Sequence, residues 1–199
     1  DLPTLFNNYK KSSNVIIIGK DPLRNRKDFY PQNGQDDFGQ FQNRYIQNSI
    51  IIGTPYGFHS SEYRNNLTSK YFRIISGLVN MGYNIYLTDL FKIWMGKPTY
   101  DPHNNLDNGG FNITGEDKED FKNLLMLEIL LLQPKYILLL GRRVEEEIKN
   151  RIKELTSSQI ICIPHISNAA NGAWAELLGA QFNDDNKVNY VLKIFKKEV

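Results

Sequence analysis

Residues 15–22 read Val-Ile-Ile-Ile-Gly-Lys-Asp-Pro, and this stretch joins a strand signal to a carboxylate. Four consecutive β-branched residues are typical of a strand that is covered on both faces, as at the centre of a parallel sheet. Gly19 ends the run, so Asp21 follows the carboxyl end of the predicted strand, where open α/β sheets bind their ligands. Asp21 is therefore a candidate general base in a loop that Pro22 stiffens, and an Asp-Pro turn without chemistry is the alternative.

The length and composition of the chain predict a single domain over residues 1–199. Of its 199 residues, 41% are hydrophobic and 23% are charged, which suits one core of ordinary size. No apolar run approaches the roughly 18 residues of a membrane span, and no signal segment is evident. We therefore expect a soluble, cytoplasmic monomer that associates with the nucleoid if it acts on DNA. The single cysteine, Cys162, lies in an apolar run, so we expect a buried thiol, no metal cluster and no other cofactor.

The net charge of +2 neither requires nor excludes a nucleic-acid partner, because the distribution of charge matters more than its sum. Basic residues follow two of the predicted strands, at positions where they can meet phosphate. These residues are Arg24, Arg26 and Lys27 after the first strand, and Arg142 and Arg143 after a later one. Lys193, Lys196 and Lys197 are expected on a solvated helix face.

Strand and helix signals alternate along the chain. Strands are predicted at 14–18, 84–88, 136–140 and 159–163. Helices are predicted at 67–81, with Tyr71 on the apolar face, at 116–132 and from about 143 to 155. A last pair of helical segments follows the final strand. Thr114 and Asp117 resemble a capping box for the second helix. The long segment 23–48 lacks periodicity and is typical of a functional or mobile loop. The alternation predicts an α/β fold, a three-layer α/β/α sandwich around a mostly parallel four-stranded sheet.

Two further polar residues stand at predicted strand ends. Asp89 follows the strand at 84–88, and His165 follows the last strand, in the sequence Pro164-His-Ile-Ser-Asn168. Two aspartates and a histidine at equivalent strand ends favour a catalytic site, although a single histidine near a proline is more often structural. No metal-binding spacing and no phosphate-binding loop occurs, which argues against a metalloprotease or a kinase.

Four short motifs arrive in an order that resembles the uracil-DNA glycosylase superfamily. They are Gly19-Lys-Asp-Pro22, Tyr86-Leu-Thr-Asp89, the stretch from Pro134 to Gly141, and Pro164-His-Ile-Ser167. The resemblance covers roughly residues 14–178. The first motif is similar to the Gly-Gln-Asp-Pro motif of the classical family, and the others are closer to the Fe-S-containing members, although a single cysteine excludes that cluster.

The resemblance implies a role for each matched residue. Asp21 would orient the water that attacks C1′ of the deoxyribose of a flipped-out base, and His165 would hydrogen-bond O2 of the base and stabilise the departing anion. Tyr56 would stack on the extruded base, although a turn tyrosine is the alternative. Ser167 would help to hold backbone phosphate. The implied substrate-binding residues are Gly19, Lys20, Pro22, Tyr56, Asp89, Ser167 and Asn168, and the candidate DNA-backbone contacts are Arg24, Arg26, Arg142 and Arg143.

Three departures from the family pattern bear on the substrate. Asp89 replaces the asparagine that reads the uracil edge, and an ionised carboxylate can only accept hydrogen bonds, so either Asp89 is protonated or the base differs. Leu23 replaces the tyrosine that excludes thymine. The segment after His165 lacks a proline and an evident apolar wedge, for which Trp174 is a distant candidate.

Two functions remain open at this stage. The first is a glycosylase that removes uracil or another damaged base from DNA, with no membrane and no metal among its partners. The second is a member of the same superfamily that binds a nucleobase, a nucleotide or a protein without glycosylase activity. Retention of Asp21 and His165 favours the first function, and the change at Asp89 favours the second.

Overall fold

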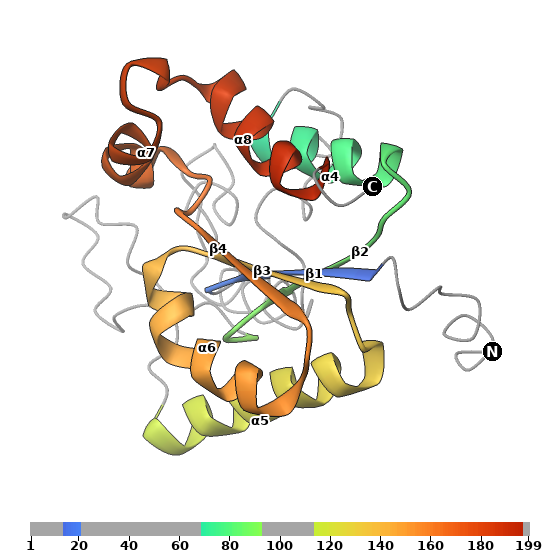
Figure 1. Ribbon diagram of the computed structural model, residues 1–199. Coiled ribbons are helices and arrows are strands. Elements are labelled where there is room, and N and C mark those ends of the chain that lie inside the picture. The colour runs from blue at the N-terminus through green and yellow to red at the C-terminus, as the bar shows by residue number, and fades with distance from the viewer. Residues whose placement is uncertain (1–13, 21–68, 93–113, 197–199) are drawn as a thin grey trace, which may run out of the picture.

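The computed structural model describes residues 14–20, 69–92 and 114–196 (Figure 1). Within these residues the four strands form one sheet in the order β2-β1-β3-β4, and every neighbouring pair is parallel. The predicted α/β/α sandwich with a parallel sheet is therefore confirmed. Its elements are β1 (Asn14–Gly19), α4 (Lys70–Asn80), β2 (Asn84–Asp89), α5 (Gly115–Leu132), β3 (Tyr136–Leu140), α6 (Arg142–Leu155), β4 (Gln159–Ile163), the 3-10 turn η3 (Asn168–Ala170), α7 (Asn171–Leu178), the 3-10 turn η4 (Gly179–Gln181) and α8 (Asp184–Lys196).

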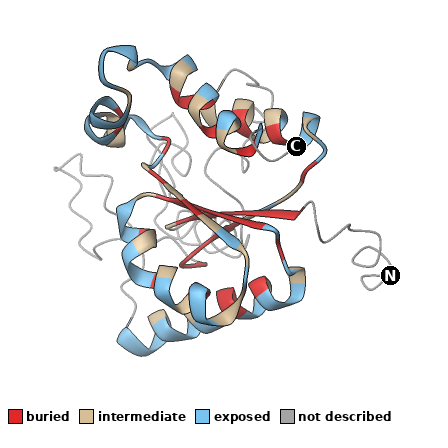
Figure 2. Cartoon of the chain, viewed as in Figure 1, coloured by how far each residue is buried: buried red, intermediate tan, exposed pale blue. Residues whose placement is uncertain are grey.

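Helices cover both faces of the sheet, as Figures 1 and 2 show. The apolar run of β1 serves both layers, because successive side chains point to opposite faces. Val15 and Ile17 pack with residues of α4, α7 and α8, whereas Ile16 and Ile18 pack with residues of α5 and α6. We call these the α4/α8 face and the α5/α6 face. All six residues of β1 are buried, which is why its sequence shows no polar alternation.

The strand order places a topological switch point between β1 and β3. Along the chain, β2 is added on one side of β1, and β3 and β4 are then added on the other side. In open α/β sheets the crevice outside the carboxyl ends of the strands at such a point is the usual ligand site. The described residues at these two carboxyl ends are Gly19 and Lys20 on β1, and Gly141 after β3.

Most of the predicted boundaries hold within a few residues. The capping box is confirmed, because Asp117 N–H donates to Thr114 Oγ1 at 3.1 Å and Thr114 N–H donates to Asp117 Oδ2 at 2.8 Å. The helix predicted at 67–81 begins at Lys70, since Ser69 is its N-cap. Asp89 proves to be the last residue of β2 and does not lie beyond it.

Two predictions about single side chains need correction. Cys162 is partly buried and not fully buried, because it lies on β4 near Glu145 and Lys149 of α6, which are themselves only partly buried. Burial and the nearby Glu145 carboxylate raise the pKa of its thiol. Trp174 is completely buried, so it cannot be a wedge that enters DNA.

None of the described helices is both long and apolar enough to cross a membrane.

Candidate functional site

The described candidate residues gather along the carboxyl edge of the sheet. Because the strands are parallel, β1, β2 and β4 all end at this edge, as the sequence predicts. Asp89 lies at the β2 end, and His165 lies two residues beyond the β4 end. Neighbouring strands are about 4.8 Å apart, so three steps across the sheet separate these ends by roughly 14 Å. The candidate residues are therefore spread along the edge, with Asp89 and His165 at its two ends and the ends of β1 and β3 between them.

Several predicted site residues lie outside the described part of the chain. They are Asp21, Pro22, Arg24, Arg26 and Tyr56. Asp21 is the next residue after Lys20, whose carbonyl accepts a hydrogen bond from Phe91 N–H at 2.9 Å. The prediction that Asp21, Asp89 and His165 line one pocket therefore remains a prediction.

Asp89 lies directly against Gly19. The two residues are register partners in the β1–β2 pair, and a Cβ atom added to Gly19 would lie only 2.3 Å from Asp89 Oδ1. The carboxylate thus occupies the space that a side chain on Gly19 would need. Asp89 is only 4% exposed, so its carboxylate is held within the protein at the end of β1. Glycine at this position is required by the close approach of Asp89.

Tyr71, in the first turn of α4, approaches Asp89 from the α4/α8 face. Burial raises the pKa of the Tyr71 phenol above its ordinary value, and the negative charge of Asp89 raises it further. The phenol therefore remains neutral and keeps its proton at physiological pH. The sequence places Tyr71 on an apolar helix face but carries no signal that the first turn of α4 lies at this carboxylate.

Lys92 fixes the end of β2 from the α5/α6 face. Its buried ammonium donates to the Asp89 carbonyl at 2.9 Å, to Thr88 Oγ1 at 2.5 Å and to Glu128 Oε2 at 2.7 Å. Burial lowers the pKa of Lys92, and the Glu128 carboxylate opposes that shift. All three protons of the ammonium have an oxygen acceptor, which is the condition under which a buried charge is tolerated. Lys92 donates to the backbone carbonyl of Asp89 and so fixes the end of β2.

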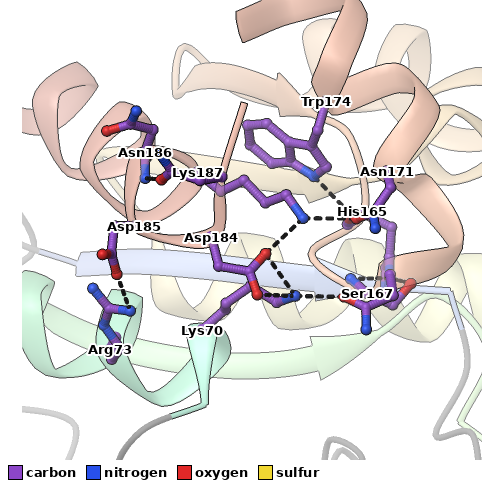
Figure 3. Close-up of polar contacts among 12 residues, drawn as sticks. Lys70, Arg73, His165, Ser167, Asn171, Trp174, Asp184, Asp185, Asn186 and Lys187 are labelled. Atoms are coloured by element: carbon purple, nitrogen blue, oxygen red, sulfur yellow. Dashed lines mark hydrogen bonds and ion pairs between the residues drawn. The ribbon is translucent and has the colours of Figure 1, made fainter. Parts of the chain in front are cut away.

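The ring of His165 has a defined tautomer. Its Nδ1 atom accepts a hydrogen bond from Ser167 N–H at 3.2 Å and lies 2.8 Å from Ser167 Oγ (Figure 3). A backbone N–H can only donate, so Nδ1 must be the unprotonated nitrogen of the neutral ring. Nε2 then carries the proton, and His165 lies at an exposed position on the carboxyl edge.

The backbone of His165 is held by two neighbours. The buried indole of Trp174 donates from Nε1 to the His165 carbonyl at 2.9 Å. On the other side, a Cβ atom on Gly141 would lie 3.4 Å from the His165 Cβ atom, and Gly141 has a left-handed φ of +92° that favours glycine. Trp174 therefore supports the histidine, which is a role different from the one its sequence position suggested.

Asn168 is engaged by the first residue of α4. Lys70 Nζ donates to Asn168 Oδ1 at 2.6 Å and contacts both carboxylate oxygens of Asp184 at 3.0 and 3.1 Å (Figure 3). Lys187 donates to Asp184 at 2.9 Å and to Asn171 at 2.7 Å. These bonds connect the loop after β4 to α4 and α8. We call the loop from residue 165 to 171 the His165 loop.

The first turn of α4 thus reaches both ends of the site. Lys70 bonds the His165 loop, and the next residue, Tyr71, lies in the field of Asp89. Sequence reasoning missed this link, because Lys70 lies 98 positions from Asn168 in the loop that it contacts. The predicted role of Asn168 in substrate binding is neither established nor excluded by its bond to Lys70.

Arg142 and Arg143 are exposed at the start of α6, next to Gly141. The Arg142 guanidinium lies 2.5 Å from Glu146 Oε1, and the Arg142 side chain is still 89% exposed. Both arginines can therefore reach a ligand in solvent near the β3 end. Among the described residues, no group of three or more His, Cys, Asp or Glu side chains is arranged to hold a metal ion.

Comparison with known proteins does not assign this site. No protein-family model matches the chain, and no curated protein matches it.

Proposed function

We propose that this protein is a DNA glycosylase of the uracil-DNA glycosylase type, which hydrolyses the N-glycosidic bond of uracil or another damaged base. The observation that carries the proposal is the Nε2–H donor of His165 at the carboxyl edge, where its tautomer is set by Ser167. Asp89 lies on the same edge, and Asp21 follows β1 in the sequence.

The proposed reaction uses these groups in a single displacement. Asp21 orients a water molecule and takes its proton as the water oxygen bonds to C1′ of the deoxyribose. The bond between C1′ and the base nitrogen breaks, and its electron pair leaves with the base. His165 Nε2–H donates to the O2 atom of the base, where the negative charge of the leaving group develops. The base must first be flipped out of the stack.

The carboxylate of Asp89 supports a substrate that differs from simple uracil. An ionised carboxylate accepts a hydrogen bond from N3–H of uracil but faces the O4 acceptor without a proton. A base with donors along that edge fits better. The phenol of Tyr71, which lies in the field of Asp89, also carries a proton on this side of the site.

A base-release assay tests the proposal. Oligonucleotides that carry uracil, hypoxanthine, xanthine or oxidised pyrimidines are incubated with the full chain and with the variants Asp21→Asn and His165→Gln. We expect release of at least one base, with losses of orders of magnitude for both variants. Lys193→Gln, an exposed change on α8, is the matched control and should retain activity.

Asp89→Asn sharpens the substrate assignment. We expect this variant to raise uracil excision relative to the native protein, because the amide supplies the missing donor for O4. If the change instead abolishes an excision activity of the native protein, the carboxylate itself reads the substrate and uracil is not the preferred base.

The second candidate is a nucleobase-binding protein without hydrolysis, which the buried carboxylate of Asp89 favours. Binding without release of any tested base would support this candidate. Oligonucleotide affinity should fall steeply with salt if Arg142 and Arg143 contact phosphate, and the slope should decrease in Arg142→Ala and Arg143→Ala. Absence of both base release and oligonucleotide binding would overturn both candidates.

A further inference from the structure

Helix α7 carries the group that holds the backbone of His165, yet little of α7 itself is buried. Trp174 is the only residue of this helix that is fully buried, and its Nε1–H donates to the His165 carbonyl at 2.9 Å. Because the peptide group is planar, this bond fixes the orientation of the peptide that follows the histidine. The position of His165 therefore depends on what holds α7 in place.

Two residues of α8 contact α7, and they lie three positions apart on one side of α8. Lys187 Nζ donates to Asn171 Oδ1 at 2.7 Å. Tyr190 packs edge-to-face against Trp174, with the ring centroids 6.0 Å apart and the planes at 83°. Asn171 and Trp174 are also three positions apart, so one face of α7 meets one face of α8.

The contact between Lys187 and α7 is made by a buried charge. Lys187 is 0% exposed, and its ammonium donates to Asp184 Oδ1 at 2.9 Å and lies 4.9 Å from the centre of the Phe182 ring. A buried ammonium has lost its water, so the loss of any one oxygen acceptor is costly. A movement of α7 away from α8 would take the Asn171 oxygen from the ammonium. The buried charge of Lys187 therefore opposes displacement of α7.

The histidine is held at two points that differ in what they are attached to. Ser167 N–H bonds Nδ1 of the ring, and Trp174 bonds the backbone carbonyl (Figure 3). Ser167 belongs to the His165 loop and moves with it, whereas Trp174 belongs to a helix that α8 holds. The Trp174 bond thus connects the histidine to the helical layer on the α4/α8 face.

We propose that Lys187 and Trp174 are positioning residues for His165, with α7 as the connecting element. Lys187 sets the orientation of α7 through Asn171, and Trp174 passes that orientation to the His165 carbonyl. A displaced α7 would move Nε2 of the ring relative to a base bound at the carboxyl edge. The effect on catalysis rests on the proposed glycosylase function, whereas the effect on the geometry of His165 does not.

Nitrogen NMR of the full chain tests the connection without a substrate. We expect Asn171→Ala, Lys187→Met and Trp174→Phe each to change the ring nitrogen shifts of His165, because each removes one contact of the series. Glu176→Gln, an exposed change on α7, is the matched control and should leave the shifts unchanged. The His165 signals are assigned from their absence in His165→Gln. Native ring shifts in both Asn171→Ala and Trp174→Phe would overturn the proposal.

Hydrogen exchange at the Trp174 indole adds a test by rescue. Asn171→Ala should accelerate exchange of the indole N–H by about tenfold, the factor expected for the loss of one hydrogen bond. Asn171→Asp keeps an oxygen acceptor for Lys187 and should restore slow exchange. Fast exchange in Asn171→Asp would show that the bond to Lys187 does not hold α7, and it would overturn the role of Lys187.

Lys92→Met controls for a general loss of stability. Lys92 is also buried and paired with a carboxylate, but it lies at the far end of the site from His165. This variant should be destabilised and still show native ring shifts for His165. Equal changes in Lys92→Met and Lys187→Met would mean that the ring responds to loosening of the whole fold, which would overturn the proposal. Circular dichroism of each variant checks that the fold is retained.

The kinetics of base release test the consequence for catalysis. In Asn171→Ala, kcat should fall by about tenfold to a hundredfold while KM changes little, because a displacement of about 1 Å at a reacting group can have this effect. Asn171→Asp should recover the native kcat, and Glu176→Gln should retain it. A change confined to KM would overturn the positioning role. If the native protein releases no base, the proposed function fails, and the ring shifts of His165 still decide whether α7 positions the histidine.

Discussion

At the β2 end of the candidate site a buried lysine holds the strand terminus, whereas at the β4 end the Lys70 contacts that hold Asn168 in the His165 loop are partly exposed, beside the buried Trp174 and Lys187. Lys92 bonds three oxygens inside the protein, and Asp89 is enclosed against Gly19. Lys70 bonds Asn168 and Asp184, and the Asp184 side chain is more than half exposed. Lysine side chains thus bond oxygen acceptors at both ends of the site, but the Lys92 bonds are buried and the Lys70 bonds are partly exposed.

This difference implies different rigidity at the two ends. Interactions in a medium of low polarity are stronger, and breaking one leaves a charge without water. Exposed ion pairs contribute little, because water and salt compete for each partner. We infer that the position of Asp89 is set before a ligand arrives, whereas Asn168, which Lys70 holds, can adjust. The substitutions below test this contrast in order of decreasing effect.

Lys92→Met should produce the largest loss of stability. The change leaves the Glu128 carboxylate without its buried partner, and breaking such a pair costs about 3–5 kcal/mol of unfolding free energy. Urea denaturation measures the loss. Lys149→Met is the matched control, because its pair with Glu145 is about one-third exposed, and we expect a loss below about 1 kcal/mol.

The double variant Lys92→Met/Glu128→Leu separates charge from packing. Removal of both charges should recover most of the stability that Lys92→Met loses. If the single variant is as stable as the Lys149→Met control, the buried pair does not hold the β2 end, and the contrast between the two ends fails.

Gly19→Ala should produce the next largest effect. The new methyl group would lie 2.3 Å from Asp89 Oδ1, so the carboxylate or the strand end must move. Overpacking of this kind costs about 1–3 kcal/mol. Gly172→Ala is the matched control: it lies in α7, has no atom within 4 Å of the added position, and should be neutral or stabilise by up to about 1 kcal/mol.

A second substitution tests whether the Asp89 carboxylate causes the loss of stability expected for Gly19→Ala. In an Asp89→Ala background the clashing oxygen is absent, so adding Gly19→Ala should cause little further loss of stability. An equal loss in both backgrounds would show that the Asp89 carboxylate is not the reason for glycine at position 19.

The strands and the capping box are predictable from sequence because their signals are local. The run at Val15 to Ile18 indicates a strand without reference to any other segment, and Thr114 lies only three residues from Asp117. The parallel sheet then follows from the alternation of elements. That sheet brings the Asp89 and His165 ends to one edge, so part of the candidate site is also predictable.

The supports of the site are not predictable, because each depends on a distant partner. Lys92 appears in sequence as one lysine among apolar residues, and its acceptor Glu128 lies 36 positions away. Trp174 was misjudged because its position nine residues after His165 does not reveal the direction of its indole. Lys70 bonds Asn168 across 98 positions. The burial of a side chain and the direction in which it points are known only from the folded structure.

Lys70→Met should have a smaller effect on stability and a local effect on the His165 loop. Its pair with Asp184 is partly exposed, so we expect a loss of about 1 kcal/mol or less. Nitrogen NMR shifts of the His165 ring and the Ser167 amide should change, because Asn168 loses its donor. Lys193→Met, on an exposed part of α8, should leave these shifts unchanged. Unchanged shifts in Lys70→Met would show that Lys70 does not position the loop.

The smallest effect concerns the dependence of stability on pH at Asp184. Hydrogen bonds from Lys187 and Lys70 hold the pKa of this carboxyl below its ordinary value. A carboxyl whose pKa is lower in the folded state stabilises the protein above the pKa of the unfolded chain, near pH 4, and this contribution disappears as the pH falls through the folded-state value. The stability difference between the native protein and Asp184→Asn should therefore be constant near neutral pH and shrink below about pH 4. Urea denaturation of both proteins across this range measures it. A difference that persists unchanged in acid would mean that the Asp184 carboxylate contributes through packing and not through its charge, and that the His165 loop is held to α8 without an ion pair.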